Sequence, residues 1–98
     1  MELKDFDFLS DSTEQTSTRY VTFLTPGLKR FDLAVTTTDR FYGKKLVVDL
    51  QTRLAAVLGA DDLREEGVLE AAFRLSAEEA RDLAQFLAFV LDEPQFTD

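Results

Sequence analysis

The sequence predicts an α+β fold: a four-stranded antiparallel β-meander, then a short helix and a longer C-terminal helix packed on one face of the sheet. Two observations carry this prediction. Apolar residues alternate with a period of two from residue 19 to residue 58, which is typical of strands. After Gly59 the spacing lengthens to that of a helix. A single sheet face covered by a helix is a stable way to bury both apolar surfaces.

Turn signals divide the alternating region into four runs. They lie at Pro26-Gly27, at Arg40–Gly43 and at Gln51–Arg53. We expect Gly43 to supply a left-handed residue in the second turn. The residues expected to face the core are Val21, Phe23, Phe31, Leu33, Val35, Leu46, Val48, Leu50, Leu54, Ala56 and Leu58.

The pairing of the middle strands follows from parity, because directly opposed residues share a face. One register that keeps the apolar face together sets Asp32 opposite Asp49, which is a disfavoured like-charge pair. We therefore predict the register that pairs Val35 with Val48, and we expect Val48 to lie opposite Ala56 in the last strand.

The opposite face of the sheet is predicted to be mixed in polarity. We expect either the N-terminal arm or another subunit to cover it. Its members would be Tyr20, Thr22, Asp32, Ala34, Thr36, Lys45, Val47, Asp49 and Val57.

Two helices follow the predicted strands. A short helix is expected near residues 66–73, where apolar residues recur at i, i+3 and i+4. Ser76 and Glu79 have the spacing of a capping box, and Pro94 is expected to end the longer helix that follows. The apolar stripe of that helix comprises Ala80, Leu83, Ala84, Leu87, Val90 and Leu91.

The length of 98 residues corresponds to one domain. We divide the chain into an acidic N-terminal arm and polar linker (residues 1–18), an α+β domain (residues 19–93) and a C-terminal tail (residues 94–98). The sequence contains no run that would serve as a secretory signal or a membrane span. With no cysteine to form disulfides, a cytoplasmic location is expected.

The chain lacks the side chains of most catalytic and metal sites. It has no histidine and no cysteine, which removes imidazole, thiol and zinc chemistry. No phosphate-binding glycine loop or nucleophile elbow is present. The acids at Asp61, Asp62, Glu65 and Glu66 lack the spacing of a calcium loop and suit the start of a helix. We therefore expect no enzyme, no cofactor and no metal.

The net charge of −8 is divided unevenly. Residues 19–53 hold seven basic and three acidic residues, whereas residues 54–98 hold eleven acidic and three basic residues. Because phosphate attraction needs a net positive footprint, nucleic acid is not an expected partner.

The densest unusual segment is the second turn, with Arg40, Phe41, Tyr42, Lys44 and Lys45. We call these five residues the basic-aromatic tip. Aromatic faces beside cations suit stacking on bases or binding of anionic ligands. Turn chemistry accounts equally for this composition, so the tip is either a binding site or only a hairpin.

Phe86 and Phe89 lie off the main stripe of the longer helix. They form either a wider core arc or a homodimer interface, since covering one exposed phenylalanine contributes about 1.5–3 kcal/mol.

The run from Arg30 to Lys44, RFDLAVTTTDRFYGK, resembles a family of small cytosolic proteins from Bacillus-like Gram-positive bacteria. It is a family of unknown function. The resemblance continues through Leu46–Gln51, Asp61–Leu63, Leu75–Ala80 and Phe86-Leu87, and it covers residues 17–91. It implies a cytosolic location and supplies no activity or catalytic residue.

The leading functional hypothesis is therefore a non-catalytic protein-interaction or regulatory module that acts as a homodimer or binds another protein. One alternative is a small anionic-ligand or RNA-binding domain that uses the basic-aromatic tip. A second alternative is a carboxylate enzyme, which would need Asp32 and Asp49 to line one pocket.

Overall fold

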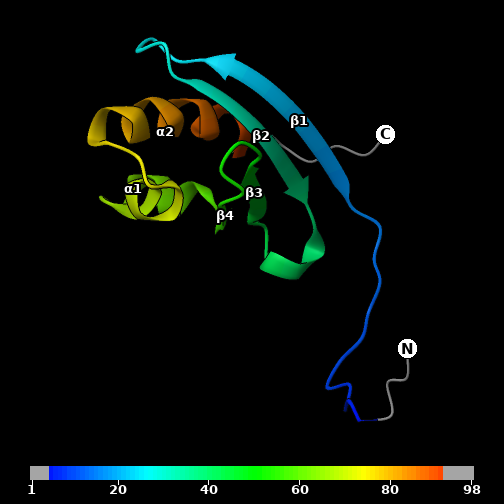
Figure 1. Ribbon diagram of the computed structural model, residues 1–98. Helices are drawn as coiled ribbons and strands as arrows, with labels where there is room; N and C mark the ends of the chain where they lie inside the picture. Colours follow the sequence, from blue (N-terminus) through cyan, green and yellow to red (C-terminus); the bar gives the residue numbers. More distant parts are fainter. Residues whose placement is uncertain (1–4, 92–98) are drawn as a thin grey trace.

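The structure, a computed structural model that describes residues 5–91, has the predicted α+β architecture (Figure 1). Its four antiparallel strands lie in the sheet in chain order. The expected helix end at Pro94 and the tail lie outside the described residues. The elements are β1 (Ser17–Leu24), β2 (Arg30–Thr37), η1 (Asp39–Phe41), β3 (Lys45–Asp49), β4 (Ala55–Leu58), η2 (Ala60–Arg64), α1 (Val68–Phe73) and α2 (Ala77–Leu91), where η marks a 3₁₀ helix.

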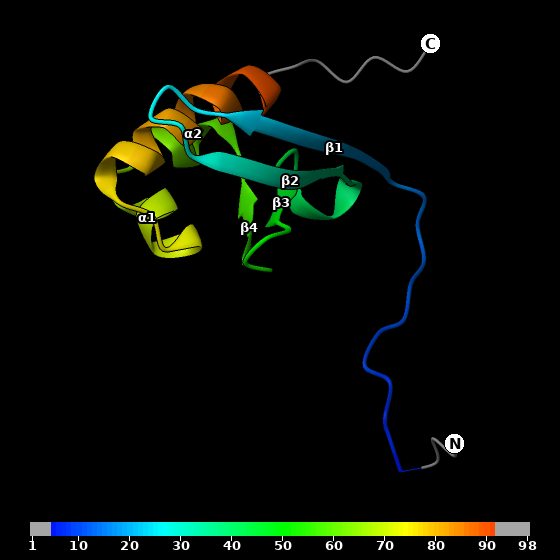
Figure 2. The same ribbon diagram turned by 45° about the horizontal axis from the view of Figure 1, so that its top comes forward.

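The hydrophobic core lies between one face of the sheet and the two α-helices (Figures 1 and 2). The predicted inward residues of β2 and the predicted stripe of α2 meet there. The core consists of Phe31, Leu33, Val35, Val47 and Leu58 from the strands and Leu69, Phe73, Ala80, Leu83, Leu87 and Val90 from the helices.

The predicted capping box starts α2. The backbone N–H of Glu79 donates to the Ser76 hydroxyl at 3.1 Å, and the N–H of Ser76 donates to the Glu79 carboxylate at 2.9 Å. Two amides that would otherwise lack partners at the helix start are thus satisfied. The hydrogen bond that the Glu79 carboxylate accepts from the Ser76 N–H is the main cause that holds the pKa of Glu79 below its ordinary value.

The predicted pairing of β3 is wrong by one residue on both sides. Val35 lies opposite Val47 rather than Val48, and Val48 lies opposite Ala55 rather than Ala56. Because side chains alternate between faces, a shift of one residue turns the whole strand over.

Strand β3 therefore presents the opposite set of side chains to the helices. Lys45, Val47 and Asp49 are buried on the core side, whereas Leu46 and Val48 are only half-buried and lie outside the core cluster. The parity argument failed because Leu46, Val47 and Val48 are all apolar, so both faces of this strand fit an apolar pattern.

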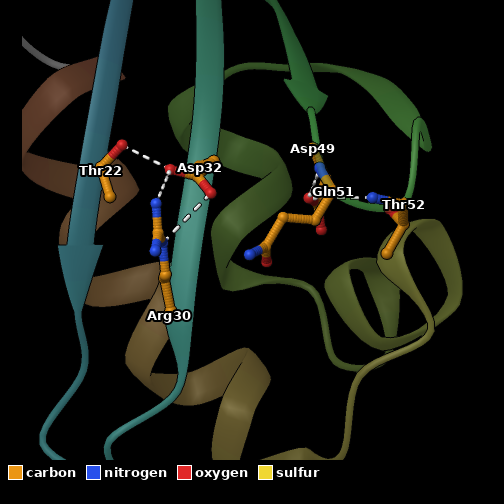
Figure 3. Close-up of polar contacts among 6 residues, drawn as sticks. All are labelled: Thr22, Arg30, Asp32, Asp49, Gln51 and Thr52. Atoms are coloured by element: carbon orange, nitrogen blue, oxygen red, sulfur yellow. Dashed lines mark hydrogen bonds and ion pairs between the residues drawn. The ribbon is translucent and has the colours of Figure 1, made fainter.

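Hydrogen bonds of the two polar side chains favour the observed orientation. The Asp49 carboxylate accepts the backbone N–H groups of Gln51 at 3.0 Å and Thr52 at 3.4 Å, which closes the turn into β4 (Figure 3). At the other end, the Lys45 ammonium donates to the carbonyl of Val90 at 3.4 Å, in the last turn of α2. A cation at a helix C-terminus is also favoured by the helix dipole.

The connection between β2 and β3 is longer than the predicted turn, which comprised the four residues Arg40–Gly43. The last pair of the two strands is Thr37 with Lys45, so residues 38–44 form the connection. Its centre is the 3₁₀ helix η1, which begins where the Thr38 hydroxyl accepts the N–H of Arg40 at 3.1 Å. This extra turn supplies the residue that shifts β3.

Asp62 attaches η2 to the sheet. Its carboxylate accepts the N–H of Gly59 at 2.8 Å and forms an ion pair with the Lys44 ammonium at 3.1 Å. These contacts, with the Gly59 amide the larger influence, hold the pKa of Asp62 below its ordinary value.

We expect Asp49→Ala to lower the free energy of unfolding by about 1–2 kcal/mol, because two turn amides lose their acceptor. Chemical denaturation followed by circular dichroism measures this change. Asp61→Ala is the matched control, since the Asp61 side chain is 89% exposed and its ion pair with Arg64 contributes little. An Asp49→Ala variant as stable as wild type would contradict the role given to this carboxylate.

Asp62 gives the stability a defined pH dependence. Its pKa is lower in the folded than in the unfolded chain, so its stabilisation is present above the ordinary aspartate pKa of about 3.9 and is lost as the pH falls through the folded value. We expect Asp62→Asn to be less stable than wild type at neutral pH and to lose less stability on acidification. Denaturation midpoints measured at a series of pH values test this, with exposed Glu66→Gln as the control.

Candidate functional site

The cationic groups of the basic-aromatic tip do not converge. Arg40 is exposed, and its guanidinium donates to the Ser12 hydroxyl at 3.2 Å. The Lys44 ammonium is paired with Asp62, and Lys45 is buried under the end of α2. Because these groups bind partners in three different places, the tip has no common cationic surface for an anion.

The aromatic residues of the tip also separate. Phe41 is half-buried, whereas Tyr42 is 99% exposed. Gly43 has the expected left-handed backbone with φ of 89°, and Tyr42 shares that region with φ of 54°. A stacking platform of two adjacent rings is therefore absent from the tip, although the left-handed backbone at Gly43 is as the sequence predicts.

Phe86 packs within the molecule. Its ring stacks on Phe23 with centroids 4.0 Å apart, and Phe23 in turn stacks on Phe31 at 5.5 Å. This stack extends the core under β1, which is the wider core arc that the sequence left open. Phe89, the other predicted interface residue, is 73% exposed on α2.

Asp32 and Asp49 lie on opposite faces of the sheet. Asp49 faces the helices, whereas Asp32 faces outward. The Asp32 carboxylate accepts a hydrogen bond from the Thr22 hydroxyl at 2.5 Å and forms an ion pair with Arg30 at 3.3 Å (Figure 3). The Thr22 hydrogen bond, followed by Arg30, holds the pKa of Asp32 below its ordinary value. The two carboxylates therefore do not line one pocket, which the carboxylate-enzyme alternative requires.

Two open hollows of about 290 and 330 Å³ lie among η2, α1 and α2, away from both of these carboxylates. Leu63, Arg64, Arg81 and Ala84 line both of them. In the part of the chain that the structure describes, no group of acidic side chains could hold a metal ion. Among residues 5–91, no helix is long and apolar enough to cross a bilayer.

The outward face of the sheet carries an apolar surface that crosses all four strands. The cross-strand row that starts at Tyr20 contains no charged side chain, and the next row adds two further apolar residues on β3 and β4. We call this surface the open-face band. It consists of Tyr20, Ala34, Val48 and Ala55 in one row and Leu46 and Val57 in the next.

No described element covers the open-face band. Tyr20 is 73% exposed and Val57 is 37% exposed, Leu46 and Val48 are half-buried, and the small Ala34 between Tyr20 and Val48 is buried. The predicted register gave this face Lys45 and Asp49 instead, so the sequence analysis missed the band. The unbroken apolar run of β3 was the one signal that could have indicated it, since strands buried on both faces show such runs.

The outward face is also electrically balanced. Among the described outward side chains of the four strands, the charged ones are Arg30 and Asp32, which form an ion pair with each other. The chain as a whole has a net charge of −8. The open face thus has no net charge from its strands, and it carries the apolar band on a strongly acidic protein.

The sequence matches no curated protein. A family model described as SAV0927-like matches residues 9–89, which span the sheet and most of α2. A Bacillus-like origin stays a prediction, whereas membership of a small family without an assigned function is confirmed. By this match, the chain belongs to the SAV0927-like family, a family of unknown function.

Proposed function

We propose that this protein is a non-catalytic interaction module that acts as a homodimer through the open face of its sheet. The observation that carries the proposal is the open-face band, an apolar row across four strands with no covering element among the described residues. Large exposed apolar patches on small proteins mark surfaces that bind another molecule.

The charge distribution favours a second copy on this face. Two chains of net charge −8 repel each other in most orientations. The open face carries one cation and one anion, so two such faces meet without a net like-charge penalty. Its apolar centre supplies attraction, since full burial of one large apolar side chain contributes about 1.5–3 kcal/mol.

The internal contacts of the polar groups support a non-catalytic role. Asp49, Asp62 and Lys45 each bind backbone groups of the fold, and Asp32 is paired with its neighbours. Such groups stabilise a scaffold and are not directed into a shared cavity. The acidic net charge also argues against nucleic acid as the partner.

We expect Val48→Lys to convert the dimer to a monomer, because it places a charge at the centre of the apolar band. Light scattering coupled to size-exclusion chromatography measures the change in mass. Phe89→Lys is the matched control, since it adds the same charge at an exposed aromatic residue on the helix side. Circular dichroism checks that both variants remain folded.

Two results of this experiment would contradict the proposal. A wild-type monomer at high micromolar concentration would reject the homodimer. A Phe89→Lys monomer beside a Val48→Lys dimer would move the interface to α2.

A further inference from the structure

The N-terminal arm carries a second uncovered apolar surface. Phe6 is 64% exposed, Phe8 is 63% exposed and Leu9 is 98% exposed. Asp5 and Asp7 alternate with the two phenylalanines. In an extended segment this alternation places both rings on one side and both carboxylates on the other.

Hydrogen bonds hold the base of the arm against the β2–β3 connection. The Glu14 carboxylate accepts the Thr38 hydroxyl at 2.8 Å and the N–H of Asp39 at 3.4 Å. Ser12 accepts the Arg40 guanidinium at 3.2 Å. Beyond these contacts the arm leaves the body of the protein, as both views show (Figures 1 and 2).

One chain therefore presents two unpartnered apolar surfaces that it does not bring together. The clamp at Ser12 and Glu14 directs the arm away from its own sheet. We infer that the arm of one copy docks on the open-face band of a second copy, with Phe6 and Phe8 as the contact residues. This inference rests on the proposed function, and it names the segment of the partner that covers the band.

The dimensions of the two surfaces agree. Alternate residues of an extended chain lie about 6.6 Å apart, and this is the spacing both of Phe6 and Phe8 and of Leu46 and Val48. An arm laid along β3 can therefore set one ring beside each of these side chains. Its aspartates then point away from the sheet and stay in water, so no charge is buried.

Charge selects the open face over the helix side of the partner. Residues 54–91, which include both α-helices, hold eight acidic and three basic residues. An acidic arm is repelled there, whereas the open face is neutral. The docking is reciprocal, because each copy has one arm and one open-face band. In a dimer, each arm therefore covers the band of the other copy, and no arm or band is left uncovered.

Cysteine cross-linking tests this inference on a clean background, because the chain has no native cysteine. Ser10→Cys places a thiol next to the apolar residues of the arm, and Ala55→Cys places one at the exposed edge of the band. The two single variants, one of them isotope-labelled, are mixed and oxidised mildly. Intact mass spectrometry then identifies the mixed disulfide dimer.

We expect the mixed dimer to form at least tenfold faster with Ala55→Cys than with Ala88→Cys. The Ala88→Cys control places the same substitution at an exposed position on α2. Equal rates for the two partners would overturn the inference. A Ser10→Cys/Ala55→Cys double variant that closes within one chain would also overturn it, since the arm would then cover its own sheet.

A second variant separates this inference from the proposed function. Phe6→Ser/Phe8→Ser removes the two rings and leaves the sheet unchanged, so we expect it to be a folded monomer by light scattering. If this variant remains a dimer that Val48→Lys dissociates, the open-face homodimer stands and the arm is not its contact. If wild type is monomeric, the proposed function itself fails.

Discussion

The Asp49 carboxylate and the Lys45 ammonium point to the same side of β3, and the rest of the molecule is arranged around that orientation. Asp49 accepts two amides of the turn into β4, and Lys45 reaches the carbonyl of Val90 in α2. Both polar groups are buried on the helix side, where their hydrogen bonds offset the cost of burial. Val47 lies between them and enters the core.

Turning these residues inward leaves Leu46 and Val48 on the other face. Together with Tyr20 and Val57 they form a surface that differs from the solvated face of an ordinary two-layer protein. Helices could have covered a face of this composition, but both α-helices pack on the opposite side. The open-face band is thus a direct consequence of how β3 is oriented.

The basic-aromatic tip illustrates how tertiary contacts change the meaning of a sequence pattern. Its cations carry the same charge and lie close together in the sequence, which suggests a common anionic ligand. In the fold, Lys44 holds η2 through Asp62, and Arg40 contacts the linker at Ser12. The same residues that suggested recognition of an anion instead join the arm, the tip and η2 into one framework.

The sequence by itself determined the order of the elements, the start of α2 at the Ser76–Glu79 capping box and the inward face of β2. Those features depend on neighbouring residues and on a regular apolar period, so local rules suffice. Only the tertiary structure decided which face of β3 is buried. Three successive apolar residues make its period ambiguous, and the contact that joins Lys45 to Val90 spans 45 positions along the chain.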